Sequence, residues 1–238
     1  MYGRGAGGTF SLVATDDERQ YWGVVVATKP MAVGAVVPWA EWRVGALATQ
    51  AQSNVRYGPL GLEALRRGRS ADEVVRRLTR TDPGRDTRQL GVVDRRGDAA
   101  AWTGAKCHDW AGQVTGDGFA CQGNLLANER VVPAMAREFE RAKGTLANRL
   151  FRALVAGERA GGDRRGMESA AILVVHREAR FDPAWGDRWV DLRVDQHERP
   201  VAELGRILRR EEGETRRFLA RYVARRRRAP RRNAKRRA

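Results

Sequence analysis

The chain has 238 residues, of which 42% are hydrophobic, so it can build one or two domains with a sizeable core. Its two cysteines are too few for a disulfide scaffold, and no apolar run is long enough to cross a bilayer, which excludes the disulfide-rich and membrane-spanning classes. The net charge is +16, but ten Lys or Arg residues and no acid lie in 221–238, so residues 1–220 carry only +6.

The first fifty residues predict three strands. β-rich runs at 10–15 and 21–28 are joined by the polar residues 16–20, a pattern typical of a β-hairpin. A linking segment rich in Pro, Ala and Val follows, and a third β-rich run covers 44–49. The N-terminal part of the chain is therefore expected to contribute mainly to a sheet.

The next part of the chain predicts helix and then a second hairpin. Residues 58–80 have a helical pattern, in which Ser70 can cap the free N–H groups and Glu73, three residues on, completes a capping box. The strands expected after this helix are 88–94, 98–104 and a short one at 119–122, the last inside a loop-rich stretch at 107–128.

The C-terminal half mixes helical and strand patterns. Apolar residues at i, i+3 and i+4 predict helices, and β-rich runs predict strands. In chain order these are helices 131–142 and 146–156, strands 170–176 and 188–194, and a helix from 201 toward 228. The order lacks the strict alternation of a parallel sheet and therefore favours an α+β sandwich built around mainly antiparallel sheet.

We expect a single domain at 9–210. It would be preceded by a glycine-rich extension or propeptide at 1–8 and followed by an Arg-rich helix and disordered tail at 211–238. The first residues contain no apolar stretch of the kind found in secretory signals, so we expect a cytoplasmic protein.

One threonine, Thr9, stands between a glycine run and the first predicted strand. A threonine hydroxyl is a weak nucleophile unless a base removes its proton, and an N-terminal threonine carries such a base in its own α-amine, with a pKa of about 7.7–8.0. Cleavage after Gly8 would create that terminus, and glycine permits the strained turn that an N-to-O acyl shift needs. Alternatively, Thr9 simply begins a strand after a glycine-rich tail.

Six ordered blocks of sequence resemble the bacterial domain-of-unknown-function 1028 family. They start at Thr9 and extend to about Leu208, over about five sixths of the chain. The blocks are TFSLVATD at 9–16, the stretch from GVVVATKP to ATQAQSN at 23–54, YGPLGLEALRRG at 57–68, ACQGNLLAN at 120–128, AGGDRRGMESAAILVV at 160–175 and WVDLRVDQHERPVAEL at 189–204.

This resemblance implies a fold and an activity. The family is grouped with the N-terminal nucleophile (Ntn) hydrolases, which have a four-layer αββα sandwich of mainly antiparallel sheets and hydrolyse amide bonds. Thr9 would then be the nucleophile after removal of residues 1–8, and the substrate a small amide or peptide. Family members commonly carry this threonine nearly at the start, whereas eight residues precede it here. Processing at Gly8, a later start codon and no processing all remain open.

The resemblance also implies roles for residues at the ends of the second and third predicted strands. Thr28 would hold or activate the nucleophile, as a hydroxyl residue does in aspartylglucosaminidase-like members. Lys29 could lower the pKa of the Thr9 amine or bind a substrate carboxylate, or be a surface lysine. Thr49, Gln50 and Asn54 would contribute to an oxyanion hole, or else satisfy the main chain of their own turn.

Two later turns offer substrate-binding residues. Gln122 and Asn124 form an amide-rich turn that could donate to a substrate or brace a loop. Asp163 could bind a substrate's charged end together with Arg164, or form a structural ion pair with Arg164 or Arg165 in a glycine turn.

We expect no metal and no cofactor, because the three histidines are scattered and no pair has metal-ligand spacing. Two other functions remain open: an inactive relative that serves as a binding protein, and a polyanion-binding protein that attracts nucleic acid non-specifically through 221–238. A homo-oligomer is compatible with the sequence.

Overall fold

The structure, a computed structural model, describes residues 8–177 and 186–213. Within these residues ten strands form two antiparallel sheets, a six-stranded one in the order β10-β9-β2-β1-β8-β7 and a four-stranded one in the order β3-β4-β5-β6. The strands are β1 (Thr9–Thr15), β2 (Trp22–Thr28), β3 (Pro38–Glu41), β4 (Gly45–Ala51), β5 (Arg88–Asp94), β6 (Ala99–Thr103), β7 (Gly112–Gly116), β8 (Phe119–Asn124), β9 (Ser169–Val175) and β10 (Arg188–Val194). The predicted α+β class with antiparallel sheets is confirmed.

Both predicted hairpins form, but two strands were not predicted. β1 pairs with β2 and β5 pairs with β6, each antiparallel. The strands missed by the sequence patterns are β3 and β7, which lie at sheet edges and are only partly buried. An edge strand has a partner on one side only and tolerates proline and glycine, so its sequence carries a weak strand pattern.

The helices match the predicted periodicity. They are α1 (Tyr57–Arg66), α2 (Ala71–Arg80), α3 (Val131–Arg141), α4 (Leu146–Arg159) and a further helix described over 200–213. The predicted capping box is present at the start of α2, where Ser70 and Glu73 bond to each other's main-chain N–H groups. The Arg-rich tail, including 221–238, lies outside the described residues.

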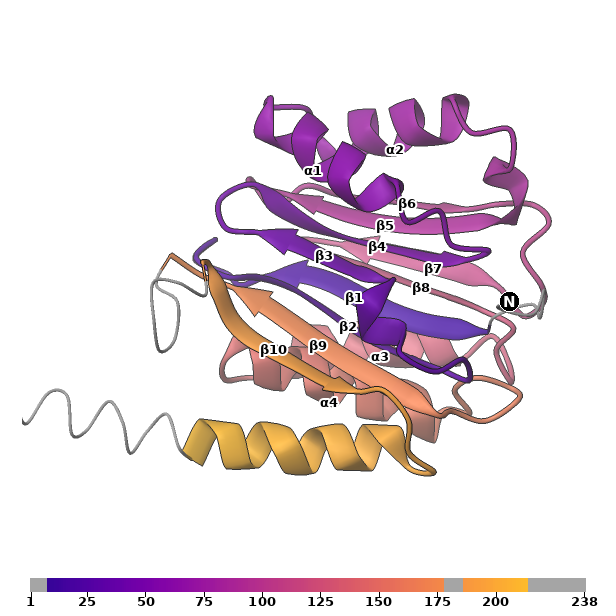
Figure 1. The fold of residues 1–238 in the computed structure, drawn as a ribbon, viewed down its shortest axis with the longest axis vertical. Coiled ribbons are helices and arrows are strands. Elements are labelled where there is room, and N and C mark those ends of the chain that lie inside the picture. The colour runs from indigo at the N-terminus through magenta and orange to yellow at the C-terminus, as the bar shows by residue number, and fades with distance from the viewer. Residues whose placement is uncertain (1–7, 178–185, 214–238) are drawn as a thin grey trace, which may run out of the picture.

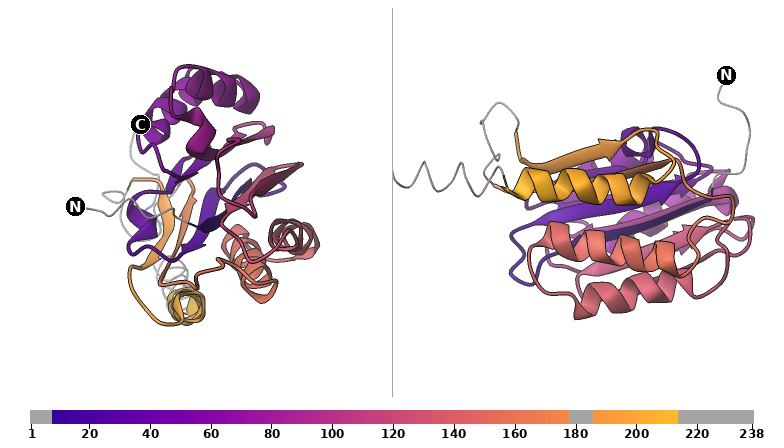
Figure 2. Two further views of the ribbon diagram at one scale, coloured as in Figure 1. Left: turned by 90° about the vertical axis from the view of Figure 1, so that its right-hand side faces the viewer. Right: turned by 90° about the horizontal axis from the view of Figure 1, so that it is seen from below.

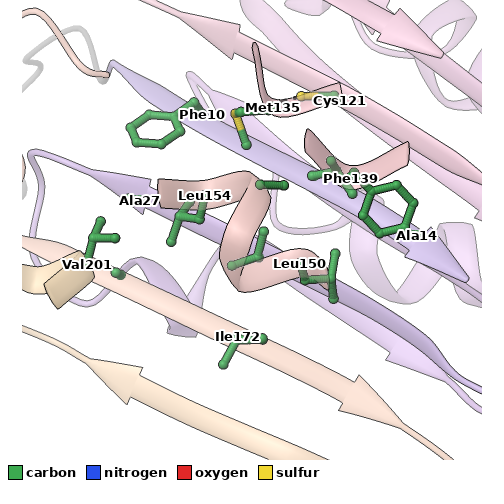
Figure 3. Close-up of a cluster of buried hydrophobic side chains, with 14 of the residues drawn as sticks. Phe10, Ala14, Ala27, Cys121, Met135, Phe139, Leu150, Leu154, Ile172 and Val201 are labelled. Carbon is green, nitrogen blue, oxygen red and sulfur yellow. Dashed lines mark hydrogen bonds between the residues drawn. The ribbon is translucent and has the colours of Figure 1, made fainter. Parts of the chain in front are cut away.

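The two sheets face each other, and helices cover both outer faces (Figures 1 and 2). Helices α1 and α2 cover the four-stranded sheet, and α3, α4 and helix 200–213 cover the six-stranded one. A large apolar cluster fills the space between the six-stranded sheet and its helices (Figure 3). It combines Phe10 of β1, Met135 and Phe139 of α3, Leu150 of α4 and Val201.

The layer between the sheets is built from smaller side chains. Val13, Val24 and Val26 of the six-stranded sheet meet Ala46 and Ala48 of β4. Alanine on this face of β4 lets the two sheets approach closely. Toward the N-terminal end of β1 the same layer changes from apolar to polar side chains.

Candidate active site

Thr9 is the first residue of β1, a central strand of the six-stranded sheet. In the ladder it pairs with Thr28 of β2 on one side and with Asn124 of β8 on the other. Because side chains alternate along a strand, Thr9 lies on the same face as Val13, which belongs to the layer between the sheets. Thr9 is only 5% exposed, so its hydroxyl group lies at the polar end of that layer.

The hydroxyl groups of Thr9 and Thr28 contact each other. Their Oγ1 atoms are 3.0 Å apart, and the Thr28 hydroxyl also donates to the main-chain carbonyl of Gly8. A hydroxyl has one hydrogen to donate, and Thr28 uses it on Gly8, so Thr9 must be the donor to Thr28. The Thr9 proton is thus held by an oxygen that is itself bonded to the carbonyl of the preceding residue.

The Gly8 carbonyl oxygen has a second donor, the guanidinium group of Arg165. Nη2 of Arg165 lies 3.2 Å from it. The carboxylate of Asp163 orients this group through two bonds, 3.1 Å from Nε and 2.8 Å from Nη2, and it also accepts the main-chain N–H of Lys29 at 3.1 Å. Two donors therefore converge on the carbonyl of the peptide bond between Gly8 and Thr9.

A glycine-rich turn presents this ion pair. Gly161, Gly162 and Gly166 have φ angles of +128°, +56° and +85°, a range that side chains disfavour. Between them the side chain of Asp163 is fully buried, while that of Arg165 is 30% exposed. The predicted pairing of Asp163 with a neighbouring arginine is present, and its partner is Arg165.

Beneath Thr9, three polar side chains bond across the two sheets. The Ser11 hydroxyl donates to Gln50 Oε1 at 2.6 Å, and Gln122 Nε2 donates to Ser11 Oγ at 2.6 Å. Gln50 Nε2 in turn donates to the main-chain carbonyl of Thr9 at 3.2 Å. Because all three side chains are buried, these bonds fix the position of the strand that carries Thr9.

Gln89 of β5 extends this network toward Asn124. Its Oε1 accepts from Gln50 Nε2 at 2.7 Å and from Asn124 Nδ2 at 3.0 Å, and its Nε2 donates to the Gly123 carbonyl at 2.7 Å. A recess of about 10 Å³ lies beside Asn124, with His108 in its wall, and has room for about one water molecule.

Thr49 and Asn54 are not brought to Thr9. Thr49 is on the face of β4 that it shares with Leu47, toward α1 and α2, and its hydroxyl donates to the Asn54 carbonyl at 3.2 Å. The Asn54 side chain donates to Asp82 at 3.0 Å. The structure thus places both residues in a bracing cluster on the helix side of the four-stranded sheet.

Asp82 is the centre of that cluster. Burial raises the pKa of its carboxyl group, but hydrogen bonds from Asn54, the Gly84 N–H, Tyr57 and Arg88 outweigh burial and hold the pKa at about 2. The carboxylate is therefore ionised at neutral pH. Burial and the adjacent carboxylate together raise the pKa of the Tyr57 hydroxyl.

Lys29 and Arg164, the other two predicted binding residues, bond to partners other than Thr9. The Lys29 ammonium pairs with Glu168 and is 41% exposed. Arg164 is exposed, and its main-chain N–H donates to the Leu125 carbonyl at 3.0 Å. Within the predicted set, Thr28 bonds to Thr9 through its hydroxyl group and Gln50 through its side-chain amide.

Two site residues, Ser11 and Gln89, were not predicted, and neither was the contact of Arg165 with Gly8. Ser11 and Gln89 are polar residues inside otherwise apolar strands, and Ser11 shares a face with Thr9. That alternation was available as a signal. No sequence pattern could indicate the Arg165 contact, because 157 residues separate its partners and only the fold brings them together.

The part of the chain that the structure describes holds no cluster of three or more His, Cys, Asp or Glu residues able to bind a metal ion. In β10 and just after it, Asp191 pairs with Arg188 and Asp195 with Arg193, which accounts for these carboxylates as ion-pair partners. No described helix combines the length and apolarity that a membrane span requires.

These features define an α+β protein with two packed antiparallel sheets and a buried hydroxyl pair where β1 begins and β2 ends. The sequence profile of DUF1028, a family of unknown function, matches residues 9–204, and the chain belongs to this family. A crystal structure of a Silicibacter pomeroyi protein of the same family is similar, with a TM-score of 0.77, 34% identity, and coverage of 85% of this chain and 88% of that one. No curated protein matches the chain.

Proposed function

We propose that the protein is an amide-bond hydrolase of the Ntn type, with Thr9 as its nucleophile and the Thr9 α-amine as its base. The observation that carries the proposal is the setting of the Gly8–Thr9 peptide bond, whose carbonyl oxygen receives two donors beside the Thr9 hydroxyl. The layer order of helices, sheet, sheet and helices is compatible with the αββα sandwich of that superfamily. The substrate is a small amide or peptide.

The first reaction takes place on the chain itself. Thr9 Oγ1 attacks the Gly8 carbonyl carbon, a C–O bond forms, the C–N bond breaks, and the hydroxyl proton passes to the departing nitrogen of Thr9. Water then hydrolyses the ester, which releases residues 1–8 with a new carboxyl group on Gly8 and leaves Thr9 with a free amine. Thr28 and Arg165 stabilise the negative charge that develops on the carbonyl oxygen.

The second reaction repeats this chemistry on a substrate. The free amine takes the Thr9 hydroxyl proton, Oγ1 forms an ester with the substrate's acyl group, the amine product leaves, and water regenerates the hydroxyl. Gln50 holds the Thr9 main chain during these steps. In this proposal the oxyanion role expected of Thr49 and Asn54 passes to Thr28 and Arg165, because their donors point at the carbonyl beside Thr9.

Removal of residues 1–8 also has a steric purpose. In the uncleaved form Thr9 is 5% exposed and Gly8 is buried beside it. The neighbouring recess at Asn124 is about 10 Å³, the size of a single water molecule. Departure of Gly8 would both free the amine and vacate space for an acyl group.

Intact-mass spectrometry of the purified full chain tests the proposal. We expect a population that begins at Thr9, and a Thr9→Ala variant that keeps residues 1–8. A wild-type protein that remains full length, or loses only Met1, would remove the self-cleaving mechanism. An inactive binding protein of the same fold would instead show the same mass pattern for wild type and Thr9→Ala.

A further inference from the structure

The residue that precedes the proposed nucleophile is held in a defined site. Gly8 is buried, and its carbonyl oxygen bonds to the Thr28 hydroxyl and to Arg165 Nη2. The following inference rests on the proposed function, because it takes this site as part of a catalytic centre.

In the proposed mechanism, Gly8 occupies the position that the acyl group of a substrate takes during turnover. During self-cleavage the Gly8 carbonyl carbon becomes an ester of Thr9 Oγ1. A substrate's acyl carbon forms the same ester on the same oxygen during turnover. The groups that surround Gly8 are therefore the groups that meet the acyl part of a substrate.

Asp163 limits what this site can hold. A Cβ atom added to Gly8 would lie 2.7 Å from Oδ1 of Asp163 and 2.8 Å from its Cγ and Oδ2, closer than side-chain carbons approach such atoms. The carboxylate cannot turn away easily, because it is fully buried and bonded to Arg165 and to the Lys29 N–H. A methyl group in this direction would face a charged group that has no room to move.

We propose that this is the acyl-binding site of the enzyme and that it selects glycyl-type acyl groups, whose α-carbon carries no L side chain. Thr28 and Arg165 donate to the acyl oxygen, and Asp163 excludes a Cβ atom. The acyl group forms an ester with Thr9 Oγ1 as the amine leaves with the hydroxyl proton. Water then returns the acyl group as a carboxylic acid.

The first test uses position 8 itself. We expect Gly8→Ala to slow cleavage at the 8–9 bond by about 10-fold to 200-fold in an intact-mass time course, the range for one misplaced methyl group in a closed pocket. The matched control is Gly7→Ala, which makes the same change one residue earlier and should cleave at the wild-type rate. If wild type cleaves and Gly8→Ala cleaves equally fast, the acyl-site inference fails and the proposed function stands. If wild type does not cleave, the proposed function fails first.

The second test uses the self-cleaved protein and two activated esters, the 4-nitrophenyl esters of N-acetylglycine and N-acetyl-L-alanine. Acylation of Thr9 is followed as a mass increase, with Thr9→Ala as the unreactive control. We expect the glycyl ester to acylate about 10-fold or more faster than the alanyl ester. Equal rates, or no acylation by either ester, would overturn the inference even though self-cleavage had occurred.

A third variant tests the donor role of Arg165. Arg165→Lys keeps a positive charge beside Asp163 but loses the paired N–H groups of the guanidinium. It should slow acylation by both esters, because the acyl oxygen loses one of its two donors. An unchanged acylation rate would contradict the role of Arg165 as a donor.

Discussion

The carboxylate of Asp82 should make the unfolding free energy of the protein depend on pH in the acidic range. Its pKa is about 2 in the folded protein, against an ordinary value of 3.8, because hydrogen bonds to the charged form outweigh the cost of its burial. A carboxyl group whose pKa is lowered by folding stabilises the native state above its unfolded pKa, and the contribution is lost as the pH falls through the folded pKa. The shift corresponds to about 2 kcal/mol at neutral pH, of which about half remains at pH 3.

The variant Asp82→Asn isolates this contribution. Unfolding free energies of wild type and variant are measured by urea denaturation, with tryptophan fluorescence as the signal, at pH 7 and at pH 3. The variant has no carboxyl group to titrate at this position and lacks the pH-dependent contribution. We therefore expect the difference in unfolding free energy between the two proteins to shrink by about 1 kcal/mol at pH 3.

The control is Asp72→Asn, in which the lost carboxylate lies on the exposed face of α2 and pairs with Arg76 at the surface. The unfolding free energy of Asp72→Asn should stay within about 0.5 kcal/mol of the wild-type value at both pH values. If the Asp82→Asn difference is equal at pH 7 and pH 3, the hydrogen bonds do not hold the pKa of Asp82 down, and the reasoning is refuted.

Four further outcomes are expected. Thr28→Val should slow cleavage after Gly8 by about 100-fold to 1,000-fold in intact-mass time courses, whereas Thr28→Ser should cleave at a rate close to that of wild type. Equal cleavage rates for the two variants would exclude a role of the Thr28 hydroxyl group in cleavage. Gln89→Leu should lower the unfolding free energy on the order of 3 kcal/mol in urea, because it strands buried partners in both sheets. Ser70→Ala should cost about 1 kcal/mol in the same assay through loss of the α2 cap, and a neutral result would contradict the capping box. Deletion of 221–238 should weaken RNA binding and flatten its salt dependence in filter-binding assays, and an unchanged affinity would exclude the tail as its cause.

Local sequence patterns predicted most elements, because the forces that form them act between near neighbours. The hairpin of β1 and β2, the cap of α2 and the periodicity of α3 and α4 each depend on residues a few positions apart. The edge strands β3 and β7 lacked such a signal. They extend only where β4 and β8 offer main-chain partners, which is a property of the assembled sheet.

The candidate site divides in the same way. The sequence identified Thr9 from its place between a glycine run and the first predicted strand, and the family resemblance added Thr28 at the end of the second. The structure pairs the two residues across neighbouring strands. The sequence also grouped Gln50 with Thr49 and Asn54, since all three follow one strand. Strand alternation separates them: Gln50 faces Thr9, while Thr49 faces the helices.

Only the tertiary structure decided what surrounds the Gly8–Thr9 bond. Arg165 and Asp163 reach it from a turn more than 150 residues away, and Gln89 reaches the Thr9 strand from the opposite sheet. The sequence around these residues does not indicate that they lie close together, because contacts between distant segments depend on the tertiary fold rather than on a local pattern. The sequence therefore specified the nucleophile candidate, and the tertiary structure specified the groups that surround it.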